Sequence, residues 1–218
     1  MRVEQRYRYV WKPLVFIAAL LPALSMLAGV FGIAGQRLGA DPVEELLLTC
    51  GKTALNLLLL TLAVTPLARI AHRPQLIRLR RMLGLFAFAY AALHFAVYLA
   101  LDRAFDASMV VEDITRRPYI TIGFTALLLL LPLAATSTQR MMRRLGRRWQ
   151  HLHRLVYLIA ILGVWHYYWQ VKRDVTEPLV YAGILAVLLG WRVWQRRGAR
   201  VRAAATSTYG SATAPGRT

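Results

Sequence analysis

The sequence is poor in cysteine and in acidic residues, and both shortages limit what the chain can be. Cys50 is the only cysteine among 218 residues, which excludes an intrachain disulfide and a cysteine-ligated iron–sulfur cluster. Ten Asp and Glu stand against 28 Lys and Arg, leaving a formal charge of +18. The glycines form no phosphate-binding pattern, so no nucleotide-binding domain is expected within the chain.

What the chain does contain is apolar sequence in long segments. Six segments contain no Asp, Glu, Lys or Arg: Leu14 to Ala34, Thr53 to Ala68, Met82 to Leu101, Pro118 to Gln139, Leu155 to Val171 and Pro178 to Trp191. A membrane-spanning helix needs roughly 17–25 mostly apolar residues. Four segments qualify directly, and the second and sixth qualify with flanking residues. The predicted fold class is therefore all-α, a polytopic bundle of six transmembrane helices without an internal repeat.

Charge alternates between the connections of these segments. One set of connections, which includes both termini, carries 20 cations against a single acid, Glu4, whereas the alternate set carries six cations against nine acids. Because short basic loops stay in the cytoplasm, both termini are predicted to be cytoplasmic. The cations lie at helix ends and not on one face, which argues against nucleic-acid binding and favours contact with membrane lipid.

Three regions and several helix boundaries follow from composition. Residues 1–13 form a basic cytoplasmic segment, 14–197 the transmembrane domain, and 198–218 a tail predicted to be disordered because Ala, Thr, Ser, Gly and Pro dominate without periodicity. Asp41-Pro42-Val43-Glu44 predicts an N-cap, a first-position proline and a reciprocal glutamate. Residues 102–117 are expected to include an amphipathic surface helix.

Two histidines lie at equal depth in different apolar segments. His94 follows Arg81 by 13 residues, and His166 follows Arg154 by 12, so both are expected roughly 18–20 Å into a bilayer core about 30 Å thick. Ionisable side chains within a membrane usually have a function. Two level imidazoles on neighbouring helices predict a bis-histidine haem site. The alternative is a pair of ordinary interhelical hydrogen bonds.

His153 lies 13 residues before His166, about 20 Å closer to the cytoplasm, where it suits a second redox site. Thirteen steps of an ideal helix end about 140° short of whole turns. The two histidines therefore share a face only if the helix unwinds, bends or bulges between them. Arg81, and not a histidine, is level with His153, so a second haem needs another ligand: His151, His72, a different group or water.

Further side chains are candidates for cofactor contacts. Arg80, Arg81 and Arg148 are placed to pair with haem propionates, because a guanidinium binds carboxylate in a charge-assisted fork. Their alternative role is to set membrane topology. The aromatic run Trp165 to Trp169 predicts mainly an interfacial belt. Lys52 is a candidate contact for an anionic cofactor or quinone.

Short motifs along nearly the whole chain carry a family resemblance. They include Gly39-Ala40-Asp41-Pro42, Gly51-Lys52-Thr53, Thr65-Pro66-Leu67, Arg80-Arg81-Met82, Leu93-His94, Arg117-Pro118-Tyr119, Leu152-His153 and His166-Tyr167. In this order they resemble the haem-binding membrane subunit of the periplasmic protein-methionine-sulfoxide reductase system, within the ferric-reductase-like transmembrane group.

The resemblance implies a b-type cytochrome of the bacterial inner membrane, an electron-transfer subunit and not the catalytic one. Its donor would be the quinone pool or a cytosolic flavin reductase, and its acceptor a separate periplasmic molybdenum enzyme that repairs oxidised methionine. The family's haem histidines carry over onto His94, His153 and His166, with one or two haems b, and the family is also described as binding FMN. The wider ferric-reductase pattern has two histidines on each of the third and fifth helices, whereas here the third helix has one.

Two other functions remain open from the residues. A small-solute or proton-coupled transporter would use the histidines as relays, although the apolar segments contain no carboxylate and intramembrane relays usually include one. A structural membrane partner would use the histidines only in packing.

Overall fold

The computed structural model describes residues 5, 7–35, 37–171 and 174–212. The predicted basic segment and tail lie partly outside these residues. In the described part the chain is helical without strands, so the predicted all-α class is confirmed. Its elements are η1 (Tyr7–Trp11), α2 (Lys12–Phe31), η2 (Ile33–Gly35), α3 (Pro42–Ile70), η3 (Pro74–Arg78), α4 (Leu79–Val97), η4 (Tyr98–Asp102), α5 (Ala107–Arg116), α6 (Pro118–Ala135), α7 (Gln139–Leu145), α8 (Arg147–Leu152), α9 (Leu155–Gln170) and α10 (Thr176–Ala212).

Five helical segments of the described chain are long and apolar enough to cross a membrane: Tyr7–Phe31, Pro42–Ile70, Pro74–Asp102, Pro118–Ala135 and Thr176–Gln195. The remaining predicted span corresponds to α9, which has only 16 residues and is shorter than a usual span. It packs against α6 and α10 all the same. The chain is thus a multi-pass membrane protein, in which α9 is the short member of a bundle with α2, α3, α4, α6 and α10.

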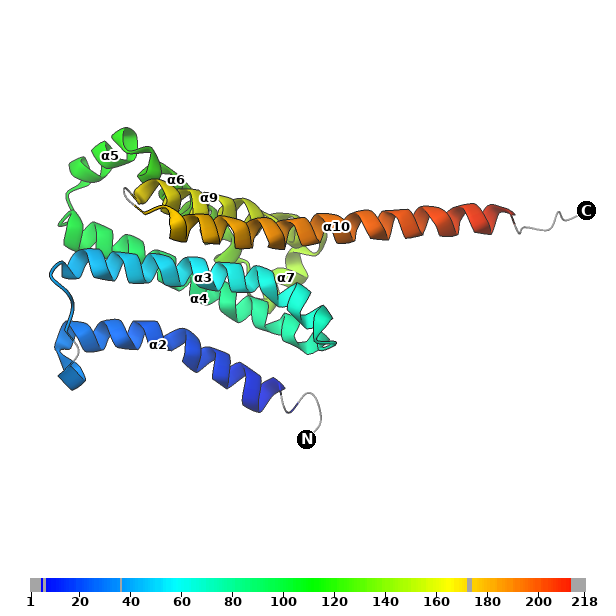
Figure 1. The fold of residues 1–218 in the computed structure, drawn as a ribbon, viewed down its shortest axis with the longest axis horizontal. Helices are drawn as coiled ribbons and strands as arrows, with labels where there is room; N and C mark the ends of the chain where they lie inside the picture. The colour runs from blue at the N-terminus through cyan, green and yellow to red at the C-terminus, as the bar shows by residue number, and fades with distance from the viewer. Residues whose placement is uncertain (1–4, 6, 36, 172–173, 213–218) are drawn as a thin grey trace, which may run out of the picture.

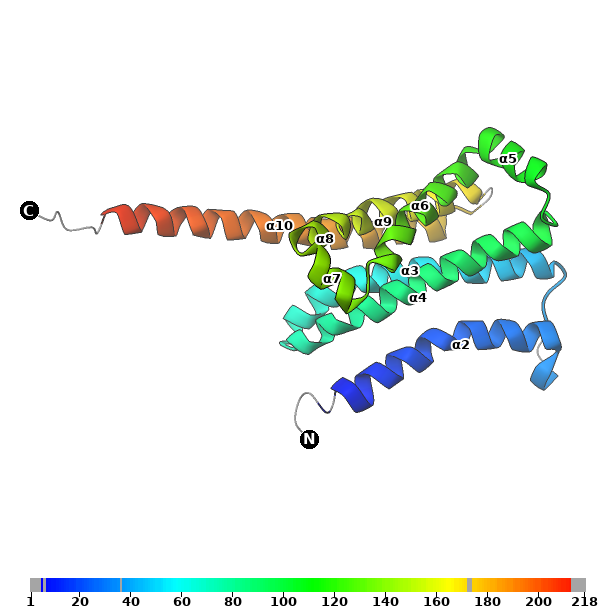
Figure 2. The ribbon, with the colours of Figure 1, turned by 180° about the vertical axis from the view of Figure 1, so that it is seen from behind.

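The bundle has two ends of opposite charge character. The α5 end, on the left in Figure 1, carries α5 and the starts of α3 and α10, where the acidic residues of the described chain lie. The opposite end, called the basic end below, carries the α3–α4 connection together with α7 and α8 (Figure 2). Helix α10 projects beyond it and stays helical to Ala212, across residues 198–212 for which composition predicts disorder.

Helix starts at the α5 end agree with the sequence in most respects. The Asp41 side chain caps α3 by accepting the N–H of Glu44 at 3.0 Å. The reciprocal contact comes from Glu45, whose Oε2 accepts the N–H of Gly39 at 2.5 Å, and not from the predicted Glu44. The expected surface helix is α5, capped by Asp106.

Tyr90 ties α2 to the rest of the bundle at Pro22. Proline lacks the N–H that would bond four residues back, so it weakens the helix around it. The Tyr90 hydroxyl lies between two groups that normally bond each other: it donates to the Ala19 carbonyl at 2.8 Å and accepts the N–H of Ala23 at 3.0 Å. A side chain of α4 thereby replaces one rung of the α2 ladder.

A second proline joins α3 to α10. Pro66 lies inside α3 and has no N–H to offer the Leu62 carbonyl four residues earlier. Arg192 of α10 donates to that carbonyl at 2.5 Å, and its guanidinium lies over the Tyr157 ring of α9, 5.3 Å from the ring centre. The proline therefore creates the acceptor that docks the last helix near the basic end.

Candidate functional site

A cavity of about 270 Å³ lies between α3, α4, α6 and α9. Most of its wall is apolar, with side chains that include Leu55, Leu58, Ala87, Leu130 and Ile159. His94 from α4 and His166 from α9 both line it. The two histidines that sequence analysis placed at equal depth thus border one apolar chamber.

The imidazoles of His94 and His166 approach each other across this chamber. Their ring centres are 6.1 Å apart and their planes meet at 83°. Two imidazoles that bind one metal ion from opposite sides have ring centres roughly 6 Å apart. This distance is the sum of two metal–nitrogen bonds of about 2 Å each and the distance from each nitrogen to its own ring centre. The separation therefore suits a shared metal ion, and rotation of one ring plane about the ligation axis does not alter the bond lengths.

Each imidazole is oriented by a backbone carbonyl of a different helix. His94 Nδ1 is 2.9 Å from the Leu47 carbonyl of α3, and His166 Nδ1 is 2.7 Å from the Tyr119 carbonyl of α6. A carbonyl can only accept, so the hydrogen must be on Nδ1 and the lone pair on Nε2. Metal-binding histidines are usually held in this way by the ring nitrogen that does not bind the metal. The residues present thus fit the axial positions of a haem.

Two glycines provide the space for these rings. A Cβ at Gly51 would lie 3.2 Å from His94 Nδ1, and a Cβ at Gly123 would lie 2.7 Å from His166 Nδ1. The second distance is shorter than real side chains tolerate, so only glycine lets α6 and the His166 ring come this close. Both glycines are on the helix that supplies the carbonyl.

The two halves of the site repeat one construction. Positions 47, 51 and 94 supply a carbonyl, a glycine and an imidazole, and positions 119, 123 and 166 do the same, each 72 residues later. The pair α3–α4 is therefore matched by the pair α6–α9. This likeness is one of construction and rests on three pairs of spaced residues, so it does not contradict the prediction that the sequence has no internal repeat.

Known proteins are similar in sequence to this chain over most of its length. Residues 50–164 match the family described as ferric reductase like transmembrane component. A protein-methionine-sulfoxide reductase heme-binding subunit MsrQ from Xanthomonas axonopodis pv. citri is 52% identical, over 93% of this chain and 94% of its own. The Bordetella pertussis protein of the same name is 50% identical, over 86% and 92%. The chain belongs to the MsrQ family. No solved structure matches it.

The third histidine of this MsrQ-family chain lies in a different setting. His153 follows α8 and precedes α9, so the helix is interrupted there. Its ring stacks on Trp149 with centres 3.9 Å apart, and its Nδ1 is 3.1 Å from the Trp149 carbonyl one turn earlier. Partial burial lowers the pKa of His153, and the charge of Arg80 lowers it further, against the opposing effect of nearby carbonyls.

The alternative inner ligands do not join a cluster. His151 is exposed and its Nδ1 is 3.0 Å from the Arg147 carbonyl of its own helix. His72 is exposed in the turn after α3, with a φ of 51°. Within the described residues no group of three or more His, Cys, Asp or Glu side chains is placed to hold a metal. The pair His94 and His166 has only two members, so it does not count as such a group.

The three arginines predicted to pair with haem propionates differ in exposure: one is half-buried and two are exposed. Arg80 is half-buried and its Nε is enclosed without a hydrogen-bond partner among the described residues, whereas Arg81 and Arg148 are exposed. The cations that line the cavity are instead Lys52, Arg103 and Arg117. In the sequence, Arg103 and Arg117 are recognisable only as charges of a connecting loop. Their positions directly after the third apolar segment and directly before the fourth, at the α5 end, were the available signal.

The structure also shows the surroundings of Lys52 and of the aromatic run Trp165 to Trp169. The Lys52 ammonium is 2.6 Å from Glu177 of α10 and lies 5.7 Å from the centre of the Tyr167 ring. Lys52 therefore pairs with a carboxylate of the chain itself, and its predicted contact with an anionic cofactor or quinone stays a prediction. In the run from Trp165 to Trp169, the two tryptophans and Tyr168 are exposed while Tyr167 is buried, an arrangement that suits an interfacial belt.

Proposed function

We propose that this chain is a b-type cytochrome that carries electrons across the bacterial inner membrane. The observation that supports this most directly is the facing pair His94 and His166, each with Nδ1 held by a carbonyl. The curated relatives are named as heme-binding subunits. His94 and His166 would hold haem b here, and with both imidazoles engaged the haem would supply one-electron transfer and not oxygen chemistry.

The protein's own contribution is orientation and exclusion of water. The carbonyls of Leu47 and Tyr119 keep both Nε2 atoms unprotonated for metal binding. The apolar wall keeps the surroundings dry, so the charge of the iron is felt strongly and the redox potential depends on the few polar groups nearby. Gly51 and Gly123 let the supporting helices come close enough to hold the rings.

The proposal includes a second redox group near His153 at the basic end. Partial burial lowers the pKa of His153, which favours the neutral imidazole that can bind a metal, and the enclosed Nε of Arg80 is a donor for an anionic group of a cofactor. Arg81 and Arg148 would contribute at the surface. A second haem is one occupant; FMN enters the proposal through the family resemblance alone.

The proposed orientation follows from the charge of the two ends, and the proposed partners follow from the family resemblance. The basic end would face the cytoplasm, and both termini with it. Electrons would enter there from the quinone pool or a cytosolic flavin reductase. They would leave at the α5 end to a periplasmic, molybdenum-containing methionine sulfoxide reductase subunit. The relatives are named as heme-binding subunits of a protein-methionine-sulfoxide reductase.

The test is the absorption spectrum and haem content of the purified full-length chain from haem-replete cells. We expect a low-spin spectrum with at least one haem per chain. In vesicles with ferricyanide trapped inside, external dithionite should reduce the ferricyanide only when the chain carries haem. A colourless protein would contradict the proposal and would favour the transporter alternative.

A further inference from the structure

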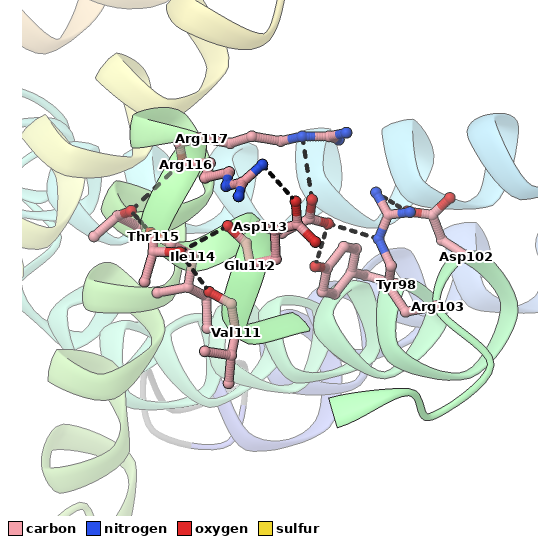
Figure 3. Close-up of polar contacts among 11 residues, drawn as sticks. Tyr98, Asp102, Arg103, Val111, Glu112, Asp113, Ile114, Thr115, Arg116 and Arg117 are labelled. Carbon is pink, nitrogen blue, oxygen red and sulfur yellow. Dashed lines mark hydrogen bonds and ion pairs between the residues drawn. The ribbon is translucent and has the colours of Figure 1, made fainter. Parts of the chain in front are cut away.

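The rim of the cavity at the α5 end is organised around one buried carboxylate. Asp113 of α5 is only 6% exposed. Arg103 Nε lies 2.6 Å and Arg117 Nε 3.1 Å from its two oxygens, and the Tyr98 hydroxyl donates to it at 2.8 Å (Figure 3). Tyr98, Arg103 and Arg117 also line the cavity that holds His94 and His166. Asp113 thus fixes three side chains of the cavity wall.

This arrangement places two guanidiniums on the wall of a chamber that is mostly apolar. Asp113 contacts each arginine through Nε, and Asp102 lies 3.4 Å from one terminal nitrogen of Arg103. A guanidinium has further N–H donors on its terminal nitrogens and no acceptor. Two guanidiniums held in place by a buried anion are preorganised for another carboxylate, which they bind with charge-assisted hydrogen bonds.

We propose that Arg103 and Arg117 form a carboxylate-binding rim that receives the propionates of haem at the α5 end. This inference rests on the proposed function, because it requires haem between His94 and His166. It replaces Arg80, Arg81 and Arg148 as propionate partners at this site, since none of the three lines the cavity. Asp113 is a positioning residue in this assignment: it holds the guanidiniums and does not itself meet the ligand.

Arg116 provides a matched control. It is the immediate neighbour of Arg117, its side chain is 77% exposed, and its ion pair is made with Glu112 on the outside of α5. Arg117 is 48% exposed and lines the cavity. The two substitutions Arg117→Met and Arg116→Met therefore remove the same charge from adjacent positions, only one of which borders the ligand chamber.

The experiment compares haem b with its dimethyl ester, which lacks the two negative charges. The full-length chain, purified from haem-deficient cells, is titrated with each ligand. The wild type should bind haem about tenfold more tightly than the ester, as expected for one charge-assisted contact. Arg117→Met should reduce that preference while binding the ester unchanged, because only Arg103 remains at the rim, and Arg116→Met should behave as the wild type.

Several outcomes would overturn the proposal. One is a wild type that binds ester and haem equally, a result that needs no variant. Another is an Arg117→Met chain that keeps the full preference, or an Arg116→Met chain in which it falls as much. In all of these a low-spin spectrum would leave the proposed function standing. A wild type with no low-spin spectrum for either ligand would end the proposed function and this inference together.

Discussion

The imidazoles of His94 and His166 each bond a carbonyl of a neighbouring helix and face each other across one cavity. That of His153 instead bonds the Trp149 carbonyl one turn earlier and has no imidazole opposite it among the described residues. An interhelical bond turns the ring away from its own backbone and across the space between helices. The local bond of His153, together with its stacking on Trp149, keeps the ring near the surface turn. Residue type is the same in both regions, so what distinguishes them is that two imidazoles face each other across one cavity in the first, whereas a single imidazole stacks on a tryptophan in the second.

The largest effect is expected from removing an axial imidazole. His94→Ala or His166→Ala should abolish the low-spin spectrum of the cavity site, because one remaining imidazole leaves an axial position open. His153→Ala should keep that spectrum and change only the second redox group. Haem-to-protein ratio and electron paramagnetic resonance of the purified variants measure the difference. Equal loss of low-spin haem in all three variants would remove the distinction between the two regions.

A smaller effect is expected from filling the space beside each ring. Gly123→Ala should lower haem content and stability more than Gly51→Ala, because its Cβ would lie 2.7 Å from the His166 ring against 3.2 Å from His94. Overpacking of this kind costs about 1–3 kcal/mol. Gly84→Ala is the control, since nothing lies within 4 Å of its Cβ.

Haem occupancy of the purified variants measures haem content, and thermal unfolding in detergent measures stability. If Gly123→Ala and Gly84→Ala proved indistinguishable, the close approach of α6 to His166 would be refuted, and with it the claim that the helices hold the rings.

The smallest effect concerns the packing of the basic end. Arg192→Met should destabilise the fold by about 1 kcal/mol, because the Leu62 carbonyl loses its donor. In a Pro66→Ala background the restored N–H supplies that carbonyl, so the same substitution should cost less there. A double-mutant cycle on unfolding free energies measures the coupling. Additive losses would mean that Arg192 acts only through its packing on Tyr157. Haem content at the cavity site should not change in any of these variants.

The sequence anticipated some parts of the site and not others. Depth along an apolar segment follows from residue counting, so the pairing of His94 with His166 was predictable. For His153 the sequence set only a condition, that it shares a face with His166 only if the helix is interrupted between them, and the structure does interrupt the helix between α8 and α9. The roles of Gly51, Gly123, Arg103 and Arg117 were not predictable, because each depends on which helices become neighbours. The six-helix bundle was predicted as well, apart from the shortness of α9.

Sequence alone determined the helical class, the membrane spans and the contrast between the two ends, because hydrophobicity and charge act locally along the chain. Tertiary structure decided which face of each helix meets the cavity and which carbonyl holds each imidazole. These features require contacts between residues far apart in the chain, and such contacts are set by how whole helices pack. No local pattern encodes them.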